Sequence, residues 1–424
     1  TASCFDISGM PFRYISNITN LNCKLFLMSG DNIYTDRPWD IAQGLTISDY
    51  WMRHRDSLFD PYYSAVYGDI YTCLTHDDHE WIDDGNATSG HMEGYNHNQM
   101  ADQFYKSALS GMNNYVANLN PSPLVANKYY YKGRYGKVGI VSLDLIFERD
   151  NLFDTATSVE ATPTCWSTDA TTTIICSGDH TSGLSSTRSM IIFENRAYPI
   201  TSGSYSDPNT NLTVASGTVS CITCTSQTTK LWKSGKQMLS REQIVATMNA
   251  LRDMDSSVDG LILVTSKPLV NIRLVNMDAW AEGGYTNQRN LMMTFCKDNL
   301  TNNCLFISGD VHKFNIFKHT FIDSNGQWEL MAGNGAAASN QSIDSTPPSG
   351  LVAELIYRQG MGIVNINTNG TPNKLPNAQV NFEIRDASAN FIYSDVGNVY
   401  EVRPTKDNFS YGLTQQNQSK IVTD

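Results

Sequence analysis

Three short apolar runs in this sequence each end in carboxylate or imidazole side chains. The runs are LFLMSGD (residues 25–31), YTCLTHDDHE (71–80) and LFISGDVH (305–312). Their apolar parts predict buried strands, and side chains at the carboxyl ends of such strands can converge on one site at the edge of a layered α/β sheet. Asp and His are ligands for metals such as Mn, Fe, Zn or Ca. The pattern therefore predicts a metal site assembled from three distant segments.

The adjacent carboxylates Asp77 and Asp78 are the strongest single indication of a metal. Neighbouring like charges repel each other and destabilise a fold unless a cation neutralises them. Each feature alone has an ordinary explanation. Asp31 after Gly30 would suit a turn, Asp77 with Asp78 would suit a helix N-cap, and His312 would suit a packed histidine. Three such strand ends in one chain favour the metal site.

The elements that must position these residues are strands alternating with helices, which predicts a layered α/β fold. The clearest helix covers residues 240–254, because Ser240 and Gln243 fit a capping box and apolar residues recur once per turn. The other predicted helices are 98–112 and 287–297, the buried strands are 23–29, 71–75, 138–143, 260–266 and 304–308, and an antiparallel meander covers 362–368, 379–386 and 390–396.

The stretch from Asn151 to Ser234 differs in composition, because it is rich in Ser and Thr and carries Cys165, Cys176, Cys221 and Cys224. We predict a β-rich insertion with disulfides, while a zinc site remains the alternative for four cysteines that include a C-x-x-C. The predicted organisation is one main domain in two parts, 1–150 and 235–403, interrupted by the insertion 151–234 and followed by a polar tail, 404–424. We expect the tail either to lie along the surface or to mediate contacts, including self-association.

Composition excludes several classes of function. The 424 residues carry a net charge of −12 without a Lys/Arg cluster, which argues against a nucleic-acid-binding surface. No apolar run approaches the roughly 18 residues that would cross a membrane. Nine cysteines, a start at Thr1 without a signal peptide, and several glycosylation sequons predict a processed, secreted glycoprotein. The sequons are at Asn17, Asn86, Asn211, Asn299, Asn340, Asn369, Asn408 and Asn417.

Three motifs in order carry a family resemblance: GDNIYTD (30–36), THDDHE (75–80) and SGDVHKF (308–314). They resemble the signature blocks of the PhoD-like metallophosphatases, a branch of the calcineurin-type metallophosphoesterase superfamily. Ser3 and Cys4 resemble the Ser-Cys of that family's first strand, and weaker similarity covers 143–150, 241–251, 263–269, 278–293 and 360–366. The resemblance implies a metallophosphatase-type β-sandwich flanked by helices.

The resemblance also implies a role for each matching residue. Asp31 would bridge metals, His79 would protonate the leaving group while Glu80 or a nearby acid orients its ring, and Arg149 would face the phosphate. Arg149 fits less well, since the family often has an earlier Arg where this chain has Leu145. The implied metal ligands are Cys4, Asp31, Tyr34, Asp77, Asp78, Asp310 and His312.

The implied function is a secreted, metal-dependent phosphoric ester hydrolase, either a phosphomonoesterase or a phosphodiesterase, with a dinuclear site and a metal-activated hydroxide. At least two metal ions are expected. Tyr34 and Cys4 would suit ferric iron, and Asp78, Asp310 and His312 would suit a divalent partner such as calcium, manganese or zinc. The alternative is a structural or adhesive extracellular glycoprotein that keeps the fold with reduced or no catalysis, and turnover of a chromogenic phosphate ester separates the two.

Cysteine arithmetic gives a further expectation. Setting Cys4 aside as a thiolate ligand leaves eight cysteines, an even number that fits a set of disulfides. We predict the pair Cys296–Cys304, two pairs within the insertion, and the pair Cys23–Cys73. An unpaired, buried Cys4 that binds no metal is the alternative for that residue.

Overall fold

The structure is a computed structural model of the chain. It describes residues 1–5, 12, 15, 18, 20–35, 46–81, 101–150, 159–167, 172–215, 219, 224–270, 280, 285–301, 304–312, 314–322, 326–333, 350–355, 360–367, 379–386, 399–404 and 411–416. Side chains within this part are described except at 101–105, 224–225, 352–355, 360, 365, 367 and from 379 onward.

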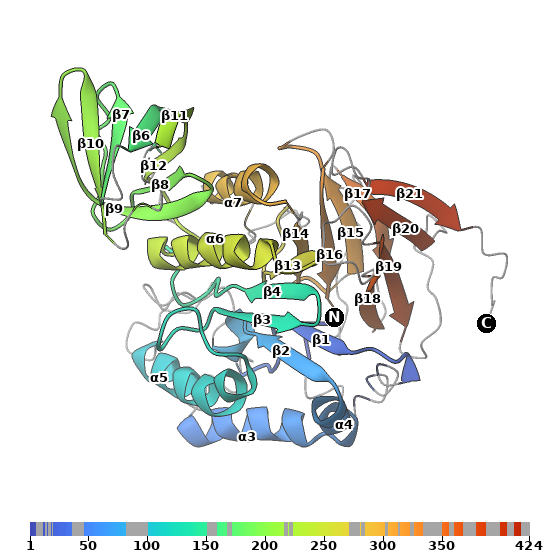
Figure 1. The fold of residues 1–424 in the computed structure, drawn as a ribbon. Coiled ribbons are helices and arrows are strands. Elements are labelled where there is room, and N and C mark those ends of the chain that lie inside the picture. Colours follow the sequence, from blue (N-terminus) through green and yellow to red (C-terminus); the bar gives the residue numbers. More distant parts are fainter. Residues whose placement is uncertain are drawn as a thin grey trace.

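A seven-stranded sheet forms the centre of the fold (Figure 1). Its strand order is β17-β15-β16-β14-β13-β4-β3. The central strands β4, β13, β14 and β16 run parallel to one another, and strands covered on both faces are expected to be continuously apolar. The predicted strands at 138–143, 260–266 and 304–308 are confirmed. The bounds are β3 Tyr131–Tyr135, β4 Val138–Ser142, β13 Gly260–Val264, β14 Cys304–Ser308, β15 Phe314–His319, β16 Gln327–Ala332 and β17 Leu351–Leu355.

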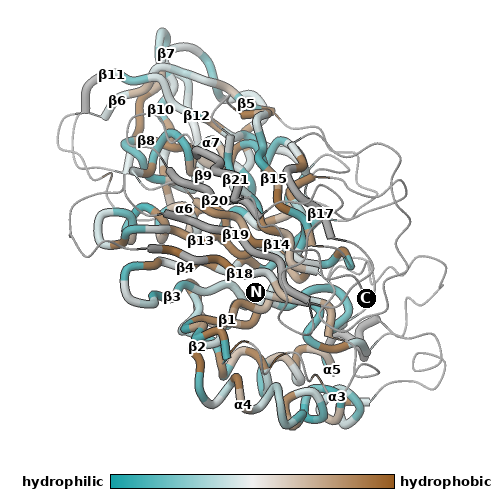
Figure 2. Tube along the Cα trace, turned by 90° about the vertical axis from the view of Figure 1, so that its right-hand side faces the viewer, coloured by the Kyte–Doolittle hydropathy of each residue, from teal (hydrophilic) through white to brown (hydrophobic). Residues whose placement is uncertain are grey.

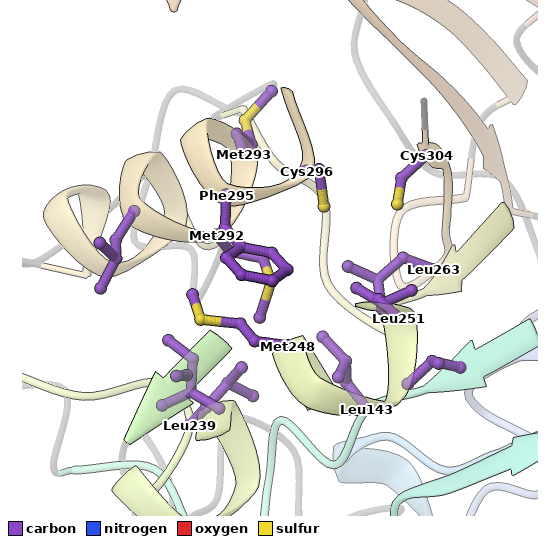
Figure 3. Close-up of a cluster of buried hydrophobic side chains, with 14 of the residues drawn as sticks. Leu143, Leu239, Met248, Leu251, Leu263, Met292, Met293, Phe295, Cys296 and Cys304 are labelled. Atoms are coloured by element: carbon purple, nitrogen blue, oxygen red, sulfur yellow. The ribbon is translucent and has the colours of Figure 1, made fainter. Parts of the chain in front are cut away.

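Two helices, α6 (Arg241–Asp255) and α7 (Thr286–Asn299), cover one face of this sheet. Figure 3 shows their apolar side chains meeting those of the strands, with Met248 and Met292 at the centre. Both helices were predicted. The Ser240 hydroxyl accepts a hydrogen bond from the amide of Gln243 as a cap should, but the reciprocal half of the predicted capping box is absent, because the Gln243 side chain binds the backbone of Asp144 instead.

A second, smaller layer lies on the opposite side of the sheet. Strands β1 (Leu25–Ser29) and β2 (Tyr71–Thr75) pair in parallel, as predicted, and Ala2 bridges to Met28 beside them. Side chains of β1 and β2 pack against the seven-stranded sheet in one apolar cluster and against helices in another. The helical elements here are α3 Ile47–Phe59, α4 Pro61–Asp69, the 3₁₀ helix η3 Asp78–Glu80, α5 Ala101–Gly111, the π-helix η4 Met112–Val116 and the 3₁₀ helix η5 Ala117–Leu119.

The mixed α/β class is therefore confirmed, whereas the specific metallophosphatase-type sandwich remains a prediction. The sequence pattern identified α5 but not α3 or α4. Figure 2 shows hydrophobic stretches along β1, β13 and β14, as expected for strands within a layered core. None of the helices in the described part is long and apolar enough to cross a membrane.

The predicted insertion forms a separate eight-stranded sheet with the order β11-β6-β7-β10-β9-β8-β12-β5. It contacts α6, where the Asn249 amide bonds both backbone groups of Ala197. Cys165 and Cys176 form a disulfide, which confirms one of the two predicted pairs and removes two ligands from the alternative zinc site. Cys221 and the side chain of Cys224 lie outside the described residues. The bounds are β5 Val159–Ala161, β6 Thr164–Ser167, β7 Thr173–Ser177, β8 Met190–Phe193, β9 Arg196–Ser206, β10 Asn209–Val214, β11 Cys224–Thr228 and β12 Lys230–Ser234.

The C-terminal part forms a four-stranded antiparallel sheet of β18 (Gly360–Asn367), β19 (Gln379–Asp386), β20 (Val399–Pro404) and β21 (Tyr411–Gln416). The meander is confirmed for its first two strands, and the third predicted strand, 390–396, falls outside the described residues. Part of the predicted tail forms strand β21, which pairs with β20 and extends the sheet.

Two predicted disulfides are not formed. Cys296 on α7 and Cys304 on β14 are buried thiols in the apolar cluster of Figure 3, and Cys23 and Cys73 are also thiols. Burial first, and then the hydrogen bond with the Cys296 thiol, raise the pKa of Cys304. Such cysteines behave as small apolar side chains, so packing explains their burial without a covalent bond.

Candidate metal centre

Two turns with the same sequence, Ser-Gly-Asp, bring distant parts of the chain together. Ser29-Gly30-Asp31 follows β1 and Ser308-Gly309-Asp310 follows β14, and the Ser29 hydroxyl donates to the carbonyl of Ser308 at 3.1 Å. A Cβ on Gly309 would lie 2.0 Å from the carbonyl oxygen of Ser29, which is impossible without moving the backbone. The glycine therefore allows the approach that places Asp31 and Asp310 at one centre.

The end of β2 joins the same centre. Gly30 has a φ of +107°, and a Cβ there would meet the Cβ of Asp77 at 2.8 Å. One Glu80 carboxylate oxygen accepts from the amide of Asp77 at 2.7 Å, and the other accepts from the Asn32 side chain at 2.7 Å. Glu80 therefore fixes the backbone beside Asp77, and its predicted role in orienting the His79 ring stays a prediction.

Three residues of the centre have left-handed backbone conformations. The φ values are 59° at Cys4, 51° at Asp31 and 67° at Asp310, a region that residues other than glycine rarely adopt. The amide of Cys4 donates to the Gly30 carbonyl at 3.3 Å, and the amide of Phe5 donates to the Asp31 carbonyl at 2.8 Å. Strained backbone held by surrounding hydrogen bonds is typical of functional sites. The strain at these three residues therefore indicates that the positions of their side chains matter for function.

Cys4, Asp31, Tyr34 and His312 form a first group of donors. The Cys4 thiol lies 3.3 Å from Asp31 Oδ2, and the Tyr34 hydroxyl lies 3.4 Å from the same oxygen. The Tyr34 hydroxyl is also 2.9 Å from Nε2 of His312. Sulfur of Cys4, a carboxylate oxygen of Asp31 and a ring nitrogen of His312 all lie within 4.8 Å of one another, a spacing that one metal ion could bridge.

Asp31, Asp77, Asp78 and Asp310 form a second group, and Asp31, Asp78 and His79 form a third, with the same spacing. Asp31 belongs to all three groups. Its Oδ1 atom is buried and has no hydrogen-bond partner among the described residues. A shared carboxylate with an unsatisfied oxygen is the arrangement expected of the predicted bridging ligand.

Lys267 completes the second group, and sequence reasoning missed it. Its ammonium nitrogen lies 2.9 Å from oxygens of Asp77, Asp78 and Asp310, and its side chain is fully buried. Lys267 follows β13 by three residues, so it stands at the same sheet edge as Asp310, which follows the neighbouring strand β14. That strand-end position was the available signal, but a single lysine before a proline is ordinarily a surface residue.

The positive charge of Lys267 lowers the pKa values of the aspartates beside it, against the effect of burial. Burial is the largest cause raising the pKa of Asp77 well above its ordinary value, and Lys267 opposes it. The pKa of Asp78 is lowered instead, because Lys267, His79 and Arg149 outweigh burial. For Asp31 and Tyr34, burial and the nearby Cys4 raise the pKa strongly. Burial and the neighbouring Cys4 therefore disfavour the anionic forms of Asp31 and Tyr34.

His79 and Arg149 lie beside the donor groups. The His79 ring packs on the Tyr34 ring with centroids 4.1 Å apart, and its carbonyl accepts from the Thr35 amide at 3.1 Å. Arg149 is fully buried, and its positive charge helps to lower the pKa of Asp78.

The segment that carries Arg149 is fixed by side chains from two other elements. Gln243 of α6 donates to the Asp144 carbonyl at 2.8 Å, and Asp144 Oδ1 lies 3.1 Å from Nε2 of His76. The same Asp144 oxygen also accepts from the backbone amides of Ile146 and Phe147 at 3.0 and 2.9 Å. These bonds anchor the loop after β4 next to the end of β2.

The sequence pattern of the PhoD-like phosphatases matches residues 1–369. The chain belongs to this family. Among solved structures it is similar to one described as PhoD, with a TM-score of 0.61 and 16% sequence identity over 99% of this chain and 71% of the other. At that identity the likeness supports the fold alone. No curated protein matches the sequence significantly.

Family membership supports a metal-dependent phosphatase. The structure brings together all seven predicted ligands, and it places His79 and Arg149 next to them. The individual roles of these residues stay predictions.

Proposed function

We propose that the chain is a metal-dependent phosphoric ester hydrolase whose metal ion is held by Cys4, Asp31, Tyr34 and His312. The observation that carries the proposal is the convergence of three donor groups on Asp31, from strand ends far apart in the sequence. Membership of the PhoD-like phosphatases supplies the reaction class.

The residues present fit a metal ion. Thiol, carboxyl, phenol and imidazole groups lie close together, and Asp31 Oδ1 is buried without a hydrogen bond from the described residues. A cation would favour the anionic forms of Asp31 and Tyr34. A bound metal ion polarises a phosphoryl oxygen and promotes water ionisation. Anionic sulfur and phenolate donors suit trivalent iron, so iron is our first expectation.

The chain's own residues would handle protons and charge. His79 would donate a proton to the leaving oxygen, and its stacking on Tyr34 restricts where the ring can point. Arg149 would offset negative charge on the phosphate, from a loop anchored by Asp144 and Gln243.

Several finer statements are also proposals. We infer activity on monoesters or diesters and secretion of a glycosylated protein, whereas the expected dinuclear site would need calcium, manganese or zinc as a divalent partner of the first metal. We also retain the division into a two-part catalytic domain, an insertion and a tail, and the view that the protein has no nucleic-acid-binding surface. A second metal ion would have to compete with the Lys267 ammonium, which already contacts three of the expected ligands.

The test is hydrolysis of p-nitrophenyl phosphate and bis(p-nitrophenyl) phosphate by chelated and by metal-restored protein. Turnover that depends on restored metal supports the proposal. A protein that binds metal yet hydrolyses neither ester would favour the alternative, a structural or adhesive protein on the same fold.

A further inference from the structure

The acidic part of the centre already contains a cation. Lys267 donates hydrogen bonds to Asp78 and Asp310 at 2.9 Å and forms an ion pair with Asp77 at 2.9 Å. A lysine ammonium has three protons to donate, and three carboxylates surround this one. These three aspartates, with Asp31, are the carboxylates that would otherwise hold a divalent ion. The ammonium nitrogen therefore lies among the carboxylates of that ligand set.

The ammonium cannot withdraw easily. The Lys267 side chain is fully buried, so it has no solvent route to an alternative position without rearrangement. Its carbonyl accepts from the Thr265 hydroxyl at 2.8 Å, and the neighbouring Ser266 carbonyl accepts from the amide of Gly309 at 2.9 Å. The backbone under Lys267 is thus tied to the turn that carries Asp310.

The other donor group is arranged differently. Its distinctive members are Cys4, Tyr34 and His312, and the three carboxylates that contact Lys267 are not among them. Only Asp31 belongs to both sets. A metal ion bound by Cys4 and His312 would leave the ammonium in place. An ion among Asp77, Asp78 and Asp310 would have to displace it, because the ammonium already contacts all three carboxylates and would repel a second cation there.

We propose that Lys267 takes the place of a second metal ion, so that the centre holds one exchangeable metal beside one fixed protein cation. This inference rests on the proposed metal-dependent function and specifies which cations neutralise the carboxylates of its site. A chelator would then remove the metal ion but leave the charge that neutralises Asp78 and Asp310.

Metal content tests this directly and needs no turnover. Wild-type protein is stripped with a chelator, reloaded with iron together with excess manganese or calcium, desalted, and its metals counted by mass spectrometry. We expect about one tightly held ion per chain, and about two in Lys267→Ala, where the vacated space admits a hydrated cation. The matched control is Lys233→Ala, because Lys233 is also largely buried but bonds the Ser182 carbonyl within the insertion.

A second variant guards against misfolding. Lys267→Gln keeps most of the side-chain length, removes the charge and offers an oxygen ligand, so it should also gain an ion and a rise in Tm on adding manganese or calcium. Two ions in the wild type, or no gain in either folded Lys267 variant, would overturn the inference while leaving metal-dependent hydrolysis intact. Wild-type protein that holds no metal and hydrolyses no ester would overturn both proposals.

Discussion

The Tyr34 hydroxyl lies 2.9 Å from Nε2 of His312, although the two residues are 278 positions apart. The contact exists because the turns after β1 and β14 pack against each other through Gly309. A phenol and an imidazole this close, beside a buried thiol and Asp31, can serve as ligands of one ion.

Replacing Tyr34 tests the identity of this ion. A ferric phenolate absorbs visible light, so iron-loaded protein should be coloured and Tyr34→Phe should lose the band. Tyr198→Phe is the control, because Tyr198 is buried in the insertion sheet, away from the centre, and should keep the colour. An active, colourless and iron-free wild type would contradict the iron assignment but not metal dependence.

His79→Ala should lower turnover about 10² to 10⁴-fold, the usual contribution of a positioned general acid. The loss should be largest for alkyl phosphates, whose leaving group needs a proton, and smaller for p-nitrophenyl esters. The measurement is kcat for both ester classes, with His180→Ala in the insertion as the control. Equal losses on both classes would show that His79 is not the proton donor.

Gly309→Ala should destabilise the protein by about 3 kcal/mol, the upper part of the range for overpacking, because its Cβ would clash with the Ser29 carbonyl. Gly68 in α4 provides the comparison, since nothing lies within 4 Å of a Cβ built there. Gly68→Ala should be neutral or stabilising by up to about 1 kcal/mol. Chemical unfolding of both variants checks this, and a harmless Gly309→Ala would disprove the close approach of the two turns.

His54 should make stability depend on pH. Burial lowers its pKa from 6.5 to about 3, and its ring stacks on Tyr115. A depressed histidine pKa means that the folded state favours the neutral ring, so this contribution is present above pH 6.5 and is lost as the pH falls towards 3. The stability of the wild type relative to His54→Phe should fall by about 1.4 kcal/mol per pH unit in that window. A constant difference between the two unfolding free energies would show that His54 does not titrate in this way.

The sequence predicted the centre where local pattern and long-range geometry coincide. Apolar runs followed by Gly-Asp identify strands β1 and β14 and place Asp31 and Asp310 at their carboxyl ends, and the packing of the two sheets brings these ends together. No local sequence pattern identifies Lys267 as a site residue, because its burial depends on three carboxylates contributed by two other strand ends.

Other features were missed because they depend on packing. Nothing local distinguishes a pair of packed thiols such as Cys296 and Cys304 from a disulfide. The side chain of Gln243 could cap its own helix or bind the Asp144 backbone, and only the position of the loop after β4 decides between them.

Helix α3 was also missed, although Thr46 and Asp49 form a full capping box at its start.

The most direct test of the central claim is to measure metal content and phosphate-ester hydrolysis on the same samples of wild type and Asp31→Asn. Asp31 belongs to every donor group, so the variant should lose both the metal and turnover while staying folded by circular dichroism. Wild-type protein should lose turnover on chelation and regain it when metal is restored. Chelated wild type that hydrolyses as fast as loaded protein, or a folded Asp31→Asn that retains metal and activity, would contradict the account.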